Sequence, residues 1–121
     1  HPACEFSQNK ELNMIYYPIT IDFKDLFVKL KQDDKIEKIS IQSGGTLNAL
    51  FLKRKIIDHI SLVIAPCLIG GKNTPTSIDG IAPQTKDDLF NIKALKLKKC
   101  EILKHSYIYL YYDVINKTEI E

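Results

Sequence analysis

The sequence contains no tryptophan, a single methionine and only three cysteines in 121 residues. Cys4, Cys67 and Cys100 are odd in number and widely spaced, and they form no CxxC pair. The sequence therefore predicts neither a disulfide framework nor a zinc site, and no other set of His, Cys, Asp and Glu has the spacing of metal ligands. We expect reduced thiols that act as small buried apolar groups in a cytoplasmic protein.

The chain also has little excess charge and no long apolar run. Its 17 basic and 15 acidic residues leave a net charge of +2, which is too even to favour nucleic acid or an acidic membrane surface as a partner. The longest apolar stretch, 62–69, is far shorter than the roughly 20 residues that cross a bilayer. The first five residues lack the basic and apolar parts of a signal peptide. We expect a cytoplasmic protein whose main partner is neither nucleic acid nor a membrane.

Length and composition fit one ordinary domain. The sequence is 45% hydrophobic and 26% charged and shows no internal repeat. We therefore expect residues 1–121 to form a single domain, with a frayed tail over 115–121.

The first third of the sequence predicts a strand, a helix and a second strand. Residues 14–17 are a short β-prone run that ends at Pro18. Asp22 is typical of a helix N-cap, and the apolar residues after it follow helical spacing; they are Phe23, Leu26, Phe27 and Leu30. The β-branched run 36–42 predicts the second strand.

The middle of the sequence continues this alternation. A second helix follows the break at 43–46, with Leu47, Leu50 and Phe51 on its apolar side. The run 60–66 is almost entirely apolar, which is typical of a strand buried on both faces of an α/β sheet. Strands and helices in this order predict crossover units with a right-handed winding.

The last third predicts a long loop and then an antiparallel hairpin. Residues 70–83 contain the Gly70–Gly71 pair, and a loop of this length usually has a function or covers one. Residues 90–102 alternate apolar side chains with lysines, and 106–114 are strongly β-prone. We expect these two strands to turn near Lys104 and His105. The fold class is therefore α/β.

The strongest local signal is the turn S-G-G-T-L-N at residues 43–48, between a predicted strand and a predicted helix. Free N–H groups and the helix dipole attract anions at a helix start, and two glycines let a phosphate approach the main chain. Ser43 and Thr46 add hydroxyl groups. The alternative is an ordinary tight turn with Thr46 as the N-cap, because the full G-x-G-x-x-G pattern is absent.

Other candidate groups are weaker. The segment 65–71 runs from an apolar strand into Gly70–Gly71, where ligands of α/β sheets collect, but it also suits a sharp exit turn. His59 is expected to end a helix beside its dipole, and His105 to lie exposed in a hairpin turn. The four tyrosines of 107–112 are expected to pack in a core or interface. No set of residues has the spacing of a catalytic triad or dyad, so the catalytic residues are unassigned.

Several motifs in order resemble the RibD C-terminal family, the dihydrofolate-reductase-like reductases of the riboflavin pathway. The run KISIQSGGTLN at 38–48 is similar to the family's strand and glycine turn, and the run at 56–71 to its apolar strand followed by A-P-x-L-x-G-G. Ile78-Asp79-Gly80 and the closing strands complete a resemblance over 36–114. Many members carry an acidic residue before the glycines, where this chain has Gln42 or Ser43.

The resemblance implies a mixed α/β sheet with flanking helices and a C-terminal antiparallel hairpin. It also implies NADPH as hydride donor and a ribosylated diaminopyrimidine phosphate, or a similar pyrimidine or pterin, as substrate. The cofactor-binding residues carried over are Ser43, Gly44, Gly45, Thr46 and Leu47. Family members are longer, so this chain corresponds to the C-terminal portion of the domain. A missing N-terminal segment or a partner, such as the second copy in a homodimer, is expected to cover the open sheet edge.

Two readings from other classes remain open. The same fold could serve as a non-catalytic module that binds a nucleotide or only dimerises. Alternatively, the tyrosine-rich last strand could make the chain a structural interaction domain.

Overall fold

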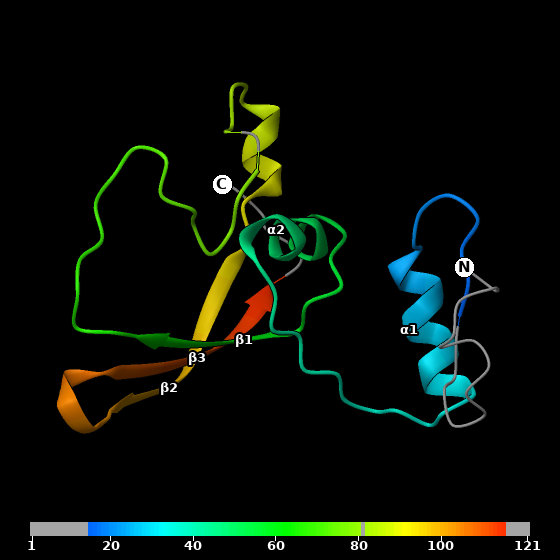
Figure 1. The fold of residues 1–121 in the computed structure, drawn as a ribbon, viewed down its shortest axis with the longest axis horizontal. Helices are drawn as coiled ribbons and strands as arrows, with labels where there is room; N and C mark the ends of the chain where they lie inside the picture. Colours follow the sequence, from blue (N-terminus) through cyan, green and yellow to red (C-terminus); the bar gives the residue numbers. More distant parts are fainter. Residues whose placement is uncertain (1–14, 81, 116–121) are drawn as a thin grey trace, which may run out of the picture. The chain divides into compact units, whose positions relative to one another are not determined.

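In a computed structural model, residues 15–80 and 82–115 are described, apart from the side chains of Phe90 and Asn91 (Figure 1). The chain divides into two compact units, His1–Ile41 and Gln42–Glu121. The first contains helix α1 (Phe23–Gln32), and the second contains every other element. These are α2 (Gly45–Lys53), β1 (His59–Ile64), the short 3-10 helix η2 (Asp87–Asn91), β2 (Ala94–Ile102), the 3-10 turn η3 (Lys104–Ser106) and β3 (Ile108–Ile115).

Helix α1 begins where the sequence predicts. The Asp22 carboxylate accepts hydrogen bonds from the backbone N–H groups of Lys24 and Asp25, at 3.0 and 3.2 Å. These bonds satisfy two N–H groups that the helix itself cannot pair. The helix ends at Gln32, the φ of 55° at Lys35 then turns the chain, and the Ile36 N–H donates back to the Leu30 carbonyl. The predicted N-cap is therefore confirmed.

A charged cluster on α1 ties the helix to the segment before it. The Tyr17 hydroxyl donates to the Asp25 carboxylate at 2.7 Å, and Lys29 lies 2.7 Å from the same carboxylate. The bond from Lys29 is the main reason that the pKa of Asp25 is lowered, and the same bond raises the pKa of Lys29. Desolvation, with the bond to Asp25 second, raises the pKa of Tyr17. All three groups are therefore held in their usual charge states at neutral pH.

Neither strand predicted in the first third forms within the described residues. Residues 15–17 and 36–42 adopt no regular secondary structure, and Met14 lies outside the described part of the chain. A β-prone sequence becomes a strand only when a neighbour pairs with its backbone. No other described segment pairs with either run, so the two predictions are wrong for this structure.

The sheet of the second unit has the order β1-β3-β2, with both pairs antiparallel (Figure 1). The predicted hairpin is confirmed: β2 turns through η3, where His105 and Ser106 have φ of 60° and 64°, and returns as β3. Residues 90–91, however, belong to η2 rather than to the strand. The prediction of crossover units is wrong for the described residues, because both strand pairs are antiparallel and no two parallel strands are hydrogen-bonded to each other there.

Burial in the described chain is concentrated at one point. Phe51 on α2 is 3% exposed, whereas Val63 on β1 is 55% exposed. The prediction that β1 is buried on both faces is therefore wrong, because no layer of the described residues covers its outer face. Cys67 and Cys100 are free thiols, as expected, but they are exposed rather than buried, and Cys4 lies outside the described residues.

Helix α2 lies at the end of the sheet where β1 and β2 begin and β3 finishes (Figure 1). The register fixes this end, since His59 pairs with Asp113 and Ala94 pairs with Ile115. No helix in the described part of the chain is long and apolar enough to span a membrane. The same residues contain no group of three His, Cys, Asp or Glu side chains that could hold a metal ion.

Candidate functional site

Helix α2 begins two residues earlier than a Thr46 cap would require. Gly44 is the N-cap, with extended backbone at φ −81° and ψ 170°, and Thr46 is the second helical residue. Glycine has no side chain to accept a hydrogen bond, so α2 has no side-chain cap. No acceptor among the described residues pairs with the N–H groups of Gly45, Thr46 and Leu47. The alternative reading with Thr46 as N-cap is therefore wrong.

The two glycines of the turn have different surroundings. A Cβ built on Gly44 would meet no atom within 4 Å, so this side of the turn is open. A Cβ on Gly45 would overlap the Thr76 carbonyl oxygen and lie 2.5 Å from the Asp79 carboxylate. The loop at Thr76 and Asp79 thus explains why residue 45 has no side chain, whereas Gly44 leaves room for a ligand.

Ser43 and Asn48 close the turn from the inside. The Ser43 hydroxyl donates to the Asn48 side-chain oxygen at 2.5 Å, and the Asn48 amide nitrogen donates to the Ser43 carbonyl at 3.2 Å. The Ser43 hydroxyl is therefore engaged within the protein. The same Asn48 nitrogen reaches the Ser77 carbonyl at 2.9 Å, so this side chain also holds part of the long loop.

The loop is fastened to the start of α2 through Asp79. The Asp79 N–H donates to the Gly45 carbonyl at 3.1 Å, and the Asp79 carboxylate accepts from the backbone N–H and the hydroxyl of Thr76, at 3.2 and 2.5 Å. A carboxylate beside the first turn of a helix is favoured by the helix dipole. It also places a negative charge at the edge of the site, on the Gly45 side.

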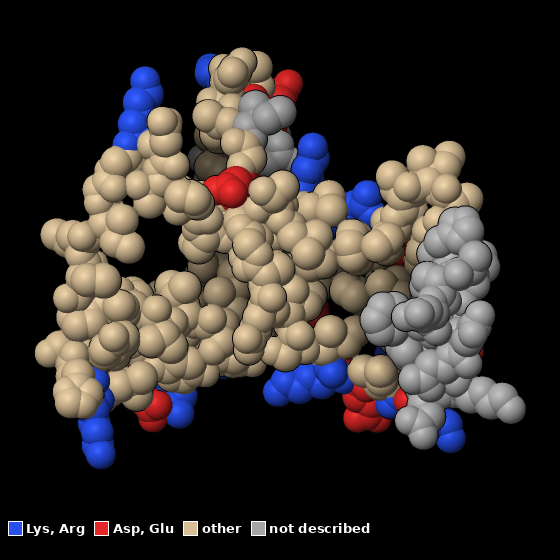
Figure 2. Space-filling view, in the orientation of Figure 1, with Lys and Arg blue, Asp and Glu red and all other residues tan. Residues whose placement is uncertain are grey.

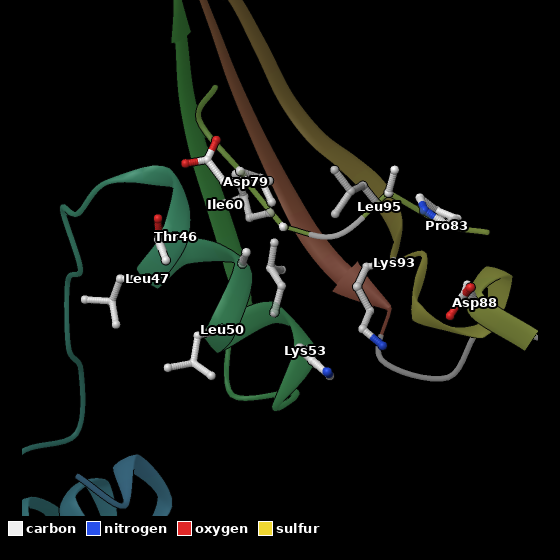
Figure 3. A pocket seen from close by; sticks show the side chains of 15 residues that line it. Thr46, Leu47, Leu50, Lys53, Ile60, Asp79, Pro83, Asp88, Lys93 and Leu95 are labelled. Carbon is white, nitrogen blue, oxygen red and sulfur yellow. The ribbon is translucent and has the colours of Figure 1, made fainter. Parts of the chain in front are cut away.

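An open cavity of about 860 Å³ adjoins this turn (Figure 3). Its apolar wall comes from Leu47 and Leu50 on α2, Ile60 on β1 and Leu95 on β2. Thr46 and the loop residues 78–80 line the end nearest the turn, and Lys53, Lys93 and Asp88 lie at the other end (Figure 3). Apolar walls with a few charged groups are typical of small-molecule sites.

The Asp88 carboxylate at the cavity is held by hydrogen bonds within its own turn. One of its carboxylate oxygens accepts the N–H groups of Gln84 and Thr85 and the Thr85 hydroxyl, each at 2.9 Å. These bonds, first of all the one from the Gln84 N–H, lower the pKa of Asp88. The carboxylate therefore fixes the turn that leads into η2.

The weaker predicted site, at residues 65–71, does not lie beside the glycine turn at 43–48. β1 starts at α2 and ends at Ile64, which pairs with Ile108 beside the hairpin turn. The exit segment at Ala65 and Pro66, and the pair Gly70–Gly71, therefore leave from the opposite end of the sheet and do not line the cavity (Figure 1). Gly71, with φ of 119°, serves the turn in which Thr74 bonds back to the Gly70 carbonyl. The Gly70–Gly71 pair therefore lies apart from the cavity beside Gly44 and Gly45.

Of the two histidines in the described residues, His59 differs from its prediction and His105 matches it. His59 is the first residue of β1, not a helix end, and its Nδ1 lies 2.9 Å from the Asp113 carboxylate of β3. The His59 ring stacks on Tyr111, with ring centroids 5.5 Å apart. His105 is exposed in the hairpin turn, as predicted. Neither histidine lines the cavity.

A family model described as the RibD C-terminal domain matches residues 2–109. The chain belongs to the RibD C-terminal domain family. The resemblance in motif order is thereby confirmed, and the family match extends to residues well before the first motif.

Curated RibD-type relatives are similar over most of this chain but are much longer. A protein of Aquifex aeolicus named 2,5-diamino-6-ribosylamino-4(3H)-pyrimidinone 5′-phosphate reductase is 27% identical over 97 residues, 80% of this chain and 41% of the relative. The riboflavin biosynthesis protein RibD of Actinobacillus pleuropneumoniae is 34% identical over 83 residues, 69% of this chain and 21% of the relative. The chain thus spans less than half the length of these relatives.

Solved structures support the RibD-type fold. A pyrimidine reductase-like protein from Corynebacterium diphtheriae has a TM-score of 0.63 at 27% identity, covering 83% of this chain and 38% of that one. RibD from Acinetobacter baumannii has a TM-score of 0.65 at 22% identity, covering 84% of this chain and 26% of that one. The described residues therefore form part of the mixed α/β, dihydrofolate-reductase-like fold, with its C-terminal antiparallel hairpin.

Sequence reasoning assigned no role to Asn48, Thr76 or Asp79 in this RibD-type chain. A signal for Asn48 was present, because asparagine is unfavourable inside a helix unless its amide is used. Asp79 stood out only as part of the Ile78-Asp79-Gly80 motif and Thr76 gave no signal, since only the folded loop brings them to Gly45, more than 30 positions earlier in the sequence.

Proposed function

We propose that this chain is the cofactor-binding portion of a cytoplasmic, homodimeric NADPH-dependent reductase of the riboflavin biosynthesis type. Its proposed substrate is a ribosylated diaminopyrimidine phosphate, or a similar pyrimidine or pterin. The observation that carries the proposal is the uncapped start of α2 with open space at Gly44, in a chain of the RibD C-terminal family.

The residues at the helix start fit a diphosphate on one side. Unpaired N–H groups of the first turn and the positive end of the helix dipole attract an anion, and Gly44 leaves the main chain accessible. Thr46 is exposed and can offer its hydroxyl, while Leu47 lines the apolar cavity next to it. NADPH, when bound, supplies the hydride, and the protein supplies its position and surroundings.

The structure supports unequal roles for the five proposed cofactor-binding residues. Gly45 faces Thr76 and the Asp79 carboxylate, and the Ser43 hydroxyl is bonded to Asn48. We therefore assign the phosphate contacts to the Gly44 side of the turn and to the N–H groups of α2. On this assignment Ser43 and Gly45 shape the turn, and Asp79 limits anion approach from its own side.

The first test is ligand-dependent melting of the protein. A ligand that binds only the folded state at 100 times its Kd stabilises that state by about 2.7 kcal/mol, so NADPH should raise the melting temperature. NADH, which lacks the 2′-phosphate, should raise it less. A melting temperature that neither nucleotide changes would refute the proposal.

The second test separates charge from shape at Gly44. Gly44→Asp and Gly44→Asn have almost the same size, both residues are good N-caps, and neither side chain meets a clash at Cβ. Both variants should fold at least as stably as the parent chain. The carboxylate should raise the Kd for NADPH by about tenfold or more over the amide, because like charges about 4 Å apart repel by about 1–4 kcal/mol. Equal Kd values, measured by fluorescence titration, would place the phosphates elsewhere.

A second candidate is a non-catalytic nucleotide-binding or dimerisation module of the same fold. The exposed apolar residues of β1 favour it. Binding of NADPH without oxidation when the diaminopyrimidine phosphate is added would support this candidate over the reductase.

A further inference from the structure

We infer that Asn48 and Thr76 are positioning residues that fasten the loop around 76–79 to the glycine turn and thereby set the affinity for NADPH. This inference rests on the proposed function for its ligand. Its structural half, the fastening of the loop, can be tested without any ligand.

The Asn48 amide is used completely within the described residues. Its nitrogen donates to the Ser43 and Ser77 carbonyls, and its oxygen accepts the Ser43 hydroxyl. One side chain therefore joins two segments that are 34 positions apart in the sequence. Asparagine inside a helix costs stability relative to alanine, so a gain from these bonds must offset its presence in α2.

Thr76 organises the loop side of the same contact. Its hydroxyl has one hydrogen to donate and lies within hydrogen-bond distance of two acceptors, the Asp79 carboxylate and the Ile78 carbonyl, the latter at 2.8 Å. These bonds fold residues 76–79 into a turn whose end, the Asp79 N–H, reaches the Gly45 carbonyl. The turn then closes over Gly45, where no side chain would fit.

The rest of the loop has no comparable attachment among the described residues. Leu68 and Ile69 are 102% and 79% exposed, and the bonds of Thr74 go to Gly70 and Gly71 within the loop itself. Asn48 and Thr76 therefore decide whether the Asp79 carboxylate stays on the Gly45 side or moves across the anion approach at Gly44. A loosened loop would bring a negative charge into the path of the diphosphate, which would weaken its binding.

The experiment uses the full chain with three uncharged changes and one rescue. Asn48→Ala removes the link to Ser77, and Thr76→Val removes the hydroxyl while keeping the shape. Thr76→Ser keeps the hydroxyl and should restore wild-type behaviour. Asn73→Ala is the matched control, because Asn73 lies exposed in the same loop and makes no hydrogen bond with another described residue.

Two measurements are made on each folded variant below its melting transition. Hydrogen exchange of the Asp79 N–H should become at least tenfold faster in Asn48→Ala and Thr76→Val, and the Kd for NADPH should rise about tenfold. Thr76→Ser and Asn73→Ala should leave both values within twofold of wild type. A residue with only a structural role would lower the melting temperature without changing the Kd of the folded protein.

The outcomes separate the two claims. Unchanged exchange in Asn48→Ala and Thr76→Val overturns the fastening of the loop. Faster exchange with an unchanged Kd overturns the positioning role. If the wild-type chain does not bind NADPH, the proposed function and the positioning role fail together, whereas the exchange rates still decide the fastening.

Discussion

Gly44 and Gly45 are neighbours in the turn, but an added methyl group would meet open space at the first and occupied space at the second. The sequence alone could not separate them, because both are consistent with close approach of a phosphate. The difference arises from Thr76 and Asp79, which reach Gly45 only after the loop has folded. The nature of the turn was thus predictable, whereas the role of each glycine was not.

This difference predicts opposite effects of small substitutions on stability. Gly45→Ala should lower the free energy of unfolding by about 1–3 kcal/mol, because the methyl group must displace the Thr76 carbonyl or the Asp79 carboxylate. Gly44→Ser should raise it by a few tenths of a kcal/mol, since serine is a better N-cap than glycine. Urea denaturation of the two variants checks this. A Gly45→Ala variant as stable as the parent would contradict the observed packing of the loop on the turn.

At the scale of single elements, local signals predicted α1 and the hairpin well. Asp22, the spacing after it and the β-prone run before Ile115 act over a few residues, and each formed the expected element. The run 36–42 failed as a strand because pairing requires a neighbour, which no local pattern supplies. The predicted direction of β1 was wrong for a related reason. An apolar run occurs in both parallel and antiparallel strands, and the sequence does not show which layer covers it.

The cap of α1 gives a direct prediction about this helix. Asp22→Ala removes both hydrogen bonds to the first turn and should destabilise the helix by about 1 kcal/mol. Asp34→Ala is the control, because Asp34 follows the helix and is exposed. Loss of the 222 nm circular dichroism signal on urea titration should occur at lower urea for Asp22→Ala only. Equal midpoints for the two variants would mean that the cap contributes nothing.

The turn before η2 predicts a dependence of stability on pH. The folded protein lowers the pKa of Asp88, so the unfolded chain binds its proton more tightly. Stability from this group is therefore fully present above the unfolded pKa and is lost as the pH falls through the folded pKa. Asp88→Asn should lose part of this acid sensitivity, measured as melting temperature against pH. A wild-type chain whose Asp88 titrates at the ordinary aspartate pKa by NMR would contradict the prediction.

For the whole molecule, the main unpredicted feature is how little apolar surface the described residues bury. Phe51 is buried, whereas Leu62, Val63 and Ile64 on β1 are exposed together. Figure 2 shows charged side chains on several parts of the visible surface, with wide uncharged areas between them. Exposed apolar strands at a sheet edge are sites of pairing with another chain.

We predict that β1 contributes to self-association of the chain. Val63→Lys should shift a dimer towards monomer, because a buried lysine charge at a pairing edge opposes association. Val28→Lys on α1 is the matched control, with the same change at a position that is 51% exposed. Light scattering over a range of concentrations gives the dissociation constants. A Val63→Lys chain that dimerises as well as the control would place the interface away from β1.

The two edges of the sheet are unlike each other, and this limits what such pairing can build. The outer strand β2 carries Lys96, Lys98 and Lys99 and a bulge between Leu97 and Lys99, while β1 has no lysine or arginine along its length. Of the two edge strands, only β1 is then suited to pair with a strand of another chain. Two copies that meet there around a two-fold axis leave only lysine-bearing edges outside, so growth stops at a pair instead of continuing into a fibre.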